Sequence, residues 1–487
     1  MKETGKLTGE RIYRIALDVF FVVLFCVYPL YSHFTYYGII DTKYAFLRLV
    51  FYAGFPVLCV LRIFLDHRVQ WKRLLPLMLW LIAVLLAWWQ SVEPSAAWHG
   101  YPTWYLGVES QLIFIGISFV FDELRNWRLF DLGIVVLVVE AVLIILNRGG
   151  IYFMNMDRGL GPEYRNIFLG TLGNVDWIAG WYALYFPLLF YRSLHAKNHQ
   201  VLWLAACAVV SVGAVCNGSD ALVLCLFLTL LLMSIHAWKA ERIRRYGYVA
   251  ATVFLSIFVF GIDAVSLIPG TVLVKITRSP VLVVIGFLCL WLGWKGERYL
   301  SVPWRRWAFL IAVFLVAFVV LFVVVNLVYP SWGGENSVLR FNDAWGNHRG
   351  FLWRSSLKTW LGLWTHDPMH ALFGVGPDQY YYLMNDLYVD EYALYFHNVP
   401  VTNAHCEIIN TLVDYGLFGC GAYVYLLAAS VMRGLRSGNA AGVMLAYCVV
   451  SVCIVNVFMF QQILSSPLEF AMIGCLLVMK TGNGKAQ

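Results

Sequence analysis

Long apolar runs alternate with short polar segments along the whole chain. Crossing the hydrocarbon core of a bilayer takes about 20 helical residues, and most of these runs approach that length. The pattern therefore predicts membrane-spanning helices, for which the solvent is lipid. We expect spans near residues 12–31, 44–64, 74–92, 106–121, 131–147, 175–192, 201–217, 219–236, 248–262, 279–294, 308–328, 411–432, 442–460 and 467–480.

These spans predict an all-α fold, a polytopic transmembrane helical bundle of about fourteen helices, with twelve as the alternative count. The composition agrees, because 61% of the residues are hydrophobic and only 13% are charged, whereas soluble domains carry about 25% charged residues. We divide the chain into membrane helices over 1–328, a large outer loop with short amphipathic helices over 329–410, and C-terminal membrane helices over 411–487. Membrane lipids are expected partners, and nucleic acid is not.

The basic residues predict the orientation of the chain in the membrane. The loops at 67–73, 239–245 and 295–306 are short and dense in Lys and Arg, and such loops are retained on the cytoplasmic side. Both termini are then cytoplasmic. The segments 93–105, 148–174 and 329–410 lie on the outer face.

The outer loop over 329–410 is too long for a simple connection and too rich in Trp and Tyr to be disordered. A helix is predicted from Arg349, with an apolar face suited to the membrane interface and with Arg354 and Lys358 beside that face. Arg349 falls on the apolar seam itself. It either snorkels at the start of the helix or binds an anion. The apolar face comprises Trp353, Leu357, Trp360, Leu361 and Trp364.

A tight turn at 374–377 (Gly-Val-Gly-Pro) interrupts the loop. Tyr380 and six further aromatic residues follow it, interleaved with acidic residues. Such faces suit stacking against sugar rings, and an interfacial aromatic belt has the same composition. Both interpretations stay open.

The loop ends in a polar cap at Thr402 and Asn403, followed by His405 and an apolar run. We expect His405 in the first turn of a transmembrane helix, where the positive end of the helix dipole disfavours imidazolium. A neutral imidazole is what a general base requires. The alternative is a structural, hydrogen-bonded histidine.

Together these residues resemble the O-antigen ligase and O-antigen polymerase superfamily of bacterial lipid-linked-glycan transferases. That family ends its large periplasmic loop with His, then Asn, Ser or Gln, nine further residues, and Gly-x-x-Gly. The chain reproduces the spacing with His405, Gly416 and Gly419, and departs from it at Cys406. Arg349 with Trp353 is similar to the family's Arg-x-x-x-Trp helix, and the turn at 374–377 is similar to its Gly-x-Gly-Pro turn.

A further likeness lies at 170–174 (Gly-Thr-Leu-Gly-Asn), with Arg158 and Arg165 just before it. One departure concerns charge. Many family members have Ser-Arg in a short outer turn where this chain has Ser219-Asp220. The missing Arg would help to hold donor phosphates, so Arg165 or Arg340 is expected to substitute for it.

The resemblance implies a glycosyltransferase of the bacterial inner membrane that moves a glycan from a polyprenyl (undecaprenyl) pyrophosphate to an acceptor hydroxyl on a lipid, protein or glycan. Arg349 is the expected diphosphate ligand, with Arg340, Arg165 and Arg158 as alternates. His405 is the expected base, and direct displacement inverts the anomeric carbon. Glu407 is expected to orient substrate rather than His405, because residues two apart on a helix do not share a face. We expect neither metal nor cofactor.

Two rival functions remain. A polymerase of lipid-linked repeat units would use the same chemistry. A flippase for lipid-linked oligosaccharides should line its interior with charge along several helices and needs no large folded outer loop. Intramembrane charge is sparse here. Glu140, in the middle of the span 131–147, should face the bundle interior, where it either pairs structurally or serves the substrate.

Overall fold

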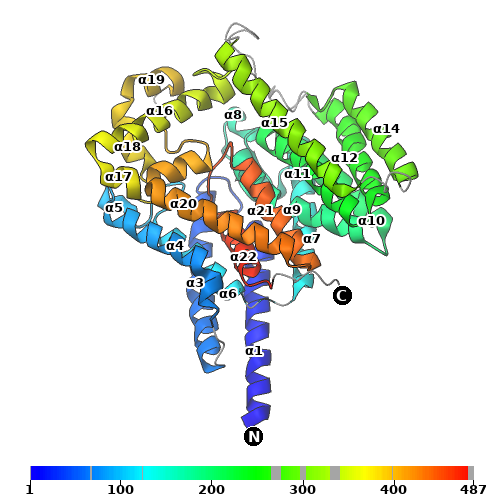
Figure 1. Ribbon diagram of the computed structural model, residues 1–487, viewed down its shortest axis with the longest axis horizontal. Coiled ribbons are helices and arrows are strands. Elements are labelled where there is room, and N and C mark those ends of the chain that lie inside the picture. The colour runs from blue at the N-terminus through cyan, green and yellow to red at the C-terminus, as the bar shows by residue number, and fades with distance from the viewer. Residues whose placement is uncertain are drawn as a thin grey trace.

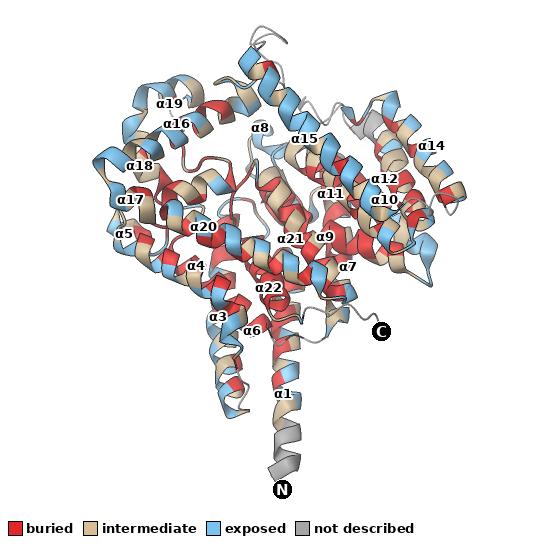
Figure 2. Ribbon diagram, viewed as in Figure 1, coloured by how far each residue is buried: buried red, intermediate tan, exposed pale blue. Residues whose placement is uncertain are grey.

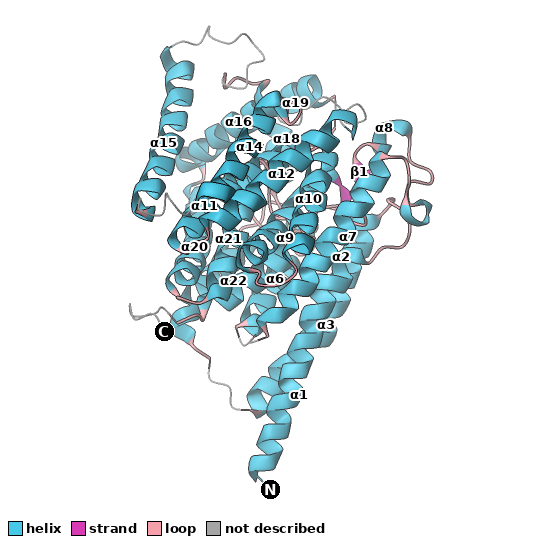
Figure 3. Ribbon diagram, turned by 90° about the vertical axis from the view of Figure 1, so that its right-hand side faces the viewer, coloured by secondary structure: helices cyan, strands magenta, loops and turns pink. Residues whose placement is uncertain are grey.

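The computed structural model describes residues 2–65, 69–122, 124, 126–264, 276–296, 303–328, 340–397 and 399–480. Helices make up almost all of the regular structure in these ranges (Figure 3). Two short strands, β1 (Phe168–Leu169) and β2 (Gly173–Asn174), pair antiparallel. The all-α helical bundle predicted from the sequence is confirmed.

The first half of the chain contains these helical elements: α1 (Lys2–Val22), η1 (Val23–Val27), α2 (Tyr28–Leu30), α3 (Ile39–Phe64), α4 (Trp71–Trp89), α5 (Pro94–Ala97), α6 (Val108–Phe121), η2 (Trp127–Leu129), α7 (Phe130–Arg148), η3 (Phe153–Asn155), α8 (Pro162–Arg165), α9 (Val175–His195), α10 (Gln200–Asn217) and α11 (Asp220–Lys239). The second half contains α12 (Ile243–Ala264), α14 (Pro280–Lys295), α15 (Trp304–Val328), α16 (Trp345–His366), α17 (Pro368–Phe373), α18 (Tyr380–Leu387), α19 (Val389–Phe396), α20 (Glu407–Arg436), α21 (Ala440–Val455) and α22 (Ser466–Leu477).

Each predicted span contains a helix. Within the described residues, nine helical segments are long and apolar enough to cross a membrane, and α6, α14, α21 and α22 are shorter apolar helices. The remaining predicted span, 175–192, corresponds to α9. Whether these five helices cross the membrane completely stays a prediction.

Helix α9 forms the centre of the bundle, where α7, α10, α11 and α21 pack around it. Its side chains are buried nearly without interruption, with Trp181 and Tyr185 among the largest (Figure 2). By contrast, α15 is the least buried candidate span and exposes apolar residues along most of its length. An apolar helix of this kind is stable when lipid is its solvent.

Glu140 faces the bundle interior, as expected for a carboxylate at this depth. It is fully buried and accepts hydrogen bonds from the Thr171 backbone N–H at 3.1 Å and from the Thr171 hydroxyl. Lys43 is also fully buried, donates to the Tyr28 carbonyl at 3.1 Å, and interacts electrostatically with Glu140. These contacts give Glu140 a structural role that joins α3, α7 and the segment before α9.

Helices α16 to α19 form a layer at one end of the bundle, beside α5 and the start of α20 (Figure 1). We call this the outer layer. Residues 329–339 of the predicted outer loop lie outside the described residues. The outer layer has its own hydrophobic core, separate from that of the bundle. That core comprises Phe351, Leu352, Val375, Tyr380, Met384, Tyr392, Val401, Ala404 and Val413.

The amphipathic helix predicted from Arg349 is present as α16, but the face that packs on the protein differs from the predicted seam. Phe351, Leu352 and Ser355 are buried, whereas Leu361 and Trp364 are exposed. The exposed apolar residues therefore remain available for a membrane interface.

Candidate active site

His405 lies in a turn just before α20, not in the first turn of the helix as predicted. The helix begins at Glu407, and Cys406 is its N-cap. His405 has a left-handed backbone (φ 48°), which takes it out of the helical path.

Burial and the nearby positive charge of Arg349 together lower the pKa of His405 to about 3. Both effects disfavour the charged imidazolium. The imidazole is therefore neutral at physiological pH, and its role as a base stays a prediction.

Hydrogen bonds fix the strained backbone at His405. Its backbone N–H donates to the side-chain oxygen of Asn403 at 3.0 Å, and the preceding Ala404 N–H donates to the side-chain oxygen of Asn410 at 3.0 Å. The ring meets Phe460 edge to face, with 5.8 Å between centroids. The imidazole thus has a defined position at the end of the bundle.

Arg349 lies at the point where α16 becomes regular. The three preceding residues, 346–348, have left-handed backbones, so the chain turns sharply there. Arg349 Nη1 donates to the Gly346 carbonyl at 2.9 Å. Its Nε is buried and has no hydrogen-bond partner among the described residues. A buried donor without a partner is costly unless a ligand supplies the acceptor.

Two carboxylates act electrostatically on Arg349. Burial lowers the pKa of Arg349, while the negative charges of Asp176 and Asp220 raise it in part. Asp220 is the first residue of α11, and Asp176 lies in the first turn of α9. Asp220 was noted from the sequence and Asp176 was not, although Asp176 lies two residues after the Gly-Thr-Leu-Gly-Asn segment at 170–174.

Aromatic side chains surround the pair. The Trp353 indole donates to the Ala404 carbonyl at 3.1 Å, and Trp104 donates to the Thr402 hydroxyl at 2.7 Å. Phe460 packs edge to face on Trp104. Phe460 belongs to an irregular segment at 456–465 between α21 and α22. The sequence predicted part of this segment as helix, because its composition resembles that of the neighbouring spans.

The Gly-Val-Gly-Pro turn at 374–377 and the Gly416-x-x-Gly419 motif of α20 pack against each other. Gly374 (φ 88°) and Gly416 (φ 65°) face each other so closely that a Cβ on Gly416 would lie 2.5 Å from the Gly374 nitrogen. The Gly376 N–H donates to the Asp414 carbonyl at 3.0 Å. The Gly416 backbone is non-helical and kinks α20 at this point. The turn of the outer layer is thereby fixed to the helix that follows His405. A Cβ on Gly419 would lie 3.5 Å from the Cβ of Ala83 in α4, so this glycine permits close packing of the two helices.

The other predicted cationic ligands lie elsewhere on the surface. Arg354 is exposed and pairs with Asp343 at 2.6 Å, and Arg165 is exposed and pairs with Asp157 at 3.4 Å. Arg158 and Lys358 are exposed, and Arg340 is half-buried. None of these five is among the charges that act on His405 or Arg349. Their roles as substrate ligands stay predictions.

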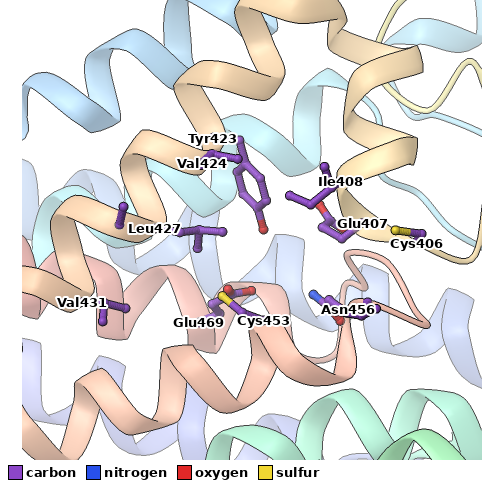
Figure 4. Close-up of a pocket in the computed structure, with 12 residues that line it drawn as sticks. Cys406, Glu407, Ile408, Tyr423, Val424, Leu427, Val431, Cys453, Asn456 and Glu469 are labelled. Carbon is purple, nitrogen blue, oxygen red and sulfur yellow. The ribbon is translucent and has the colours of Figure 1, made fainter. Parts of the chain in front are cut away.

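Tyr380 and Glu407 are placed differently from what the sequence suggested. Tyr380 is fully buried, and its hydroxyl lies 2.8 Å from the Ser356 hydroxyl. It is part of the outer-layer core and offers no surface for a sugar ring. Glu407 is also buried, and its carboxylate accepts from the Gln461 backbone N–H and from the Thr411 hydroxyl. It borders a cavity of about 330 Å³ between α20, α21 and α22 (Figure 4).

The fold and the site define a multi-pass bacterial membrane protein with a half-buried His–Arg pair at one end of its bundle. Residues 264–424, about a third of the chain, match the family model described as O-antigen ligase. The match confirms the resemblance to the O-antigen ligase superfamily, and it includes Arg349, His405, the Gly-Val-Gly-Pro turn and the Gly416-x-x-Gly419 motif. In general terms it supports a membrane glycosyltransferase of the ligase and polymerase kind. No curated protein gives a significant match to the sequence.

Proposed function

We propose that this protein transfers a glycan from a polyprenyl pyrophosphate donor to an acceptor hydroxyl at the outer face of the bacterial inner membrane. The observation that carries the proposal is the half-buried pair of a neutral His405 and a guanidinium at Arg349 whose buried Nε has no hydrogen-bond partner among the described residues. One group accepts a proton and the other binds an anion. The family match supports the same class of reaction.

Arg349 binds the donor diphosphate in this proposal. A planar guanidinium stays charged and donates two parallel hydrogen bonds to phosphate oxygens. Its free Nε gives the diphosphate a donor that the protein does not use. Asp176 and Asp220 keep the guanidinium charged and in place before the donor arrives. Negative charge that develops on the bridging oxygen is then stabilised by a preorganised group.

His405 is the general base. Its ring accepts the proton of the acceptor hydroxyl while that oxygen forms a bond to the anomeric carbon. The bond from the anomeric carbon to the phosphate oxygen breaks, and the lipid diphosphate leaves with the electron pair. Direct displacement inverts the configuration, and these steps use only the side chains described. The aromatic residues around Phe460 provide faces on which sugar rings can stack.

Reconstituted protein tests the reaction. The purified chain is given a polyprenyl-pyrophosphate glycan and candidate acceptors, and the products are separated by mass. We expect the His405→Ala variant to fold but to lose transfer activity. The matched control His366→Ala, at an exposed position on α16, should retain transfer activity. Full transfer by His405→Ala would overturn the catalytic role. Glycan growth on the donor lipid would identify a polymerase, and movement of donor across the bilayer without bond cleavage would identify a flippase.

The orientation is tested separately. We propose that both termini are cytoplasmic and that the outer layer lies on the opposite face, because the short basic loops remain inside. A reporter enzyme that is active only outside the cytoplasm, fused after residue 385, should be active. A fusion after residue 240, in a predicted cytoplasmic loop, should be inactive. The reverse result would overturn the topology.

A further inference from the structure

The cavity between α20, α21 and α22 has an apolar wall and a mouth on the lipid-exposed surface. Leu427, Ala428 and Val431 line its length along α20. Ile408, Val424 and Val457 also line it, and each of these three is more than 40% exposed. Exposed apolar residues on a membrane helix face lipid. A ligand can therefore enter this cavity directly from the bilayer.

One end of the cavity is polar. Glu407 is the first residue of α20, Asn456 follows α21 directly, and Glu469 lies in the first turn of α22. The Glu407 N–H donates to the Asn456 carbonyl at 2.9 Å, which places these helix ends at one level. That level is the end of the bundle that carries the outer layer. The cavity is therefore almost entirely apolar inside, and the polar side chains Glu407, Asn456 and Glu469 border it near the helix ends.

The Glu469 carboxyl lacks a protein partner. Glu469 is 1% exposed, and its Oε2 is buried with no hydrogen bond to any described residue. Figure 4 shows this carboxyl directed into the same space as the hydroxyl of Tyr423. None of the twelve residues that line the cavity is basic. A buried carboxylate without a donor is strongly unfavourable, so the arrangement is suited to a donor from outside the protein.

We propose that this cavity binds a membrane phospholipid whose head group carries a primary ammonium, such as phosphatidylethanolamine. An ammonium has three N–H donors, and Glu469, Glu407 and Tyr423 present acceptors at one end of the cavity. The nine residues from Tyr423 to Val431 extend about 12 Å along the helix, which provides an apolar wall for the upper part of one acyl chain. Neither His405 nor Arg349 lines this cavity.

Other bilayer molecules fit the site less well. A polyprenyl diphosphate would bring negative charge to two carboxylates, and an isoprenoid chain alone would leave Glu469 without a donor. Phosphatidylcholine has the same backbone and chains as phosphatidylethanolamine, but its quaternary nitrogen has no N–H. Phosphatidylglycerol has hydroxyl donors and a net negative charge. The head group therefore decides the selectivity.

Native mass spectrometry of the full-length protein, titrated with each lipid in the absence of glycan donor, tests the proposal. We expect phosphatidylethanolamine to be retained about tenfold more strongly than phosphatidylcholine or phosphatidylglycerol with matched chains. Phosphatidylcholine has no N–H donor, and phosphatidylglycerol brings a net negative charge to acidic side chains. Glu469→Gln should remove this preference. Asp390→Asn, at an exposed position on α19, removes the same charge and should preserve it.

A second variant keeps the test informative if Glu469→Gln does not fold. Ala428→Phe fills the apolar part of the cavity from an exposed position and should reduce retention of phosphatidylethanolamine without touching the polar end. Equal retention of the three lipids, or an unchanged preference in both variants, would overturn the proposal. Displacement of phosphatidylethanolamine by polyprenyl phosphate alone would also overturn it, because the cavity would then hold the isoprenoid chain. Transfer activity is not part of the readout, so this result is independent of the proposed reaction.

Discussion

The indole of Trp353 donates a hydrogen bond to the carbonyl oxygen of Ala404, 3.1 Å away. This bond connects the helix that carries Arg349 to the residue before His405. The two groups with complementary chemistry are separated by more than fifty positions in the sequence, and this contact helps to bring them together. The distance between the proposed base and the proposed anion ligand thus depends on a side chain that has neither role.

Trp353→Phe should slow transfer without unfolding the protein. The ring still packs against Phe458 and Trp345, but the hydrogen bond is lost, and we expect a decrease in kcat of about tenfold from the relaxed geometry. Trp364→Phe, at the exposed end of α16, serves as the control. Steady-state kinetics of the two variants provide the measurement, and equal rates would show that the bond does not position the site.

Arg349→Lys should lose most activity although the charge is kept. The ammonium cannot reproduce two parallel hydrogen bonds to a diphosphate, and loss of one preorganised contact typically costs about 10² to 10³ in rate. The variant is compared with Arg354→Lys, whose guanidinium pairs with Asp343 on the surface. If both variants retain wild-type kcat/KM, the anion that Arg349 binds is not the donor.

The pH profile of kcat/KM should show no loss of activity through protonation of His405 near pH 6.5. Burial and Arg349 lower the pKa of His405 to about 3, so the imidazole of the free enzyme stays unprotonated well below its usual range. The profile of kcat/KM should therefore be flat with respect to His405 between pH 5 and 7. Because the folded pKa lies below the unfolded one, folding stability falls as pH decreases from 6.5 toward 3. An acid limb centred near pH 6.5 in the profile of the unmodified protein would contradict this.

Gly416→Ala should destabilise the protein. Its φ is positive, and a Cβ would lie 2.5 Å from the Gly374 nitrogen and the Leu372 carbonyl. Strain of this kind costs on the order of 1–3 kcal/mol. Gly421→Ala on the same helix meets no atom within 4 Å and should be neutral or stabilising by about 0.5–1 kcal/mol. Thermal unfolding in detergent distinguishes the two variants. Equal melting temperatures would show that the close contact of Gly416 with Gly374 does not stabilise the fold.

Asp378 should make the outer layer less stable at alkaline pH. Burial raises the pKa of Asp378 to about 7, although its carboxylate accepts the N–H groups of Tyr101 at 2.7 Å and Leu106 at 3.1 Å. A raised folded pKa stabilises the fold fully below pH 3.8, and that stabilisation is lost as pH rises through 7. We expect Asp378→Asn, whose amide oxygen can still accept, to show a smaller drop in melting temperature between pH 5 and 8. An equal drop would assign the effect to another group.

Much of the architecture followed from the chain alone. Each apolar run became a helix because a segment in lipid must satisfy its own backbone hydrogen bonds. Arg349 and His405 were identifiable because charged and titratable groups at the edge of apolar helices are costly without a function. The irregular segment at 456–465 was not predicted, because a buried non-helical stretch carries the same apolar composition as a helix.

The sequence determined that this is a helical membrane protein with a histidine and an arginine at one boundary of its bundle, because hydropathy and motif spacing are local properties. Only the tertiary structure decided how those groups behave. The turn before α20 takes His405 out of the helix, and burial together with the charge of Arg349 keeps its imidazole neutral. Asp176 acts electrostatically on Arg349, Tyr380 is buried in the core of the outer layer, and Glu469 borders a lipid-accessible cavity. Each of these outcomes depends on contacts between distant segments, which no local pattern encodes.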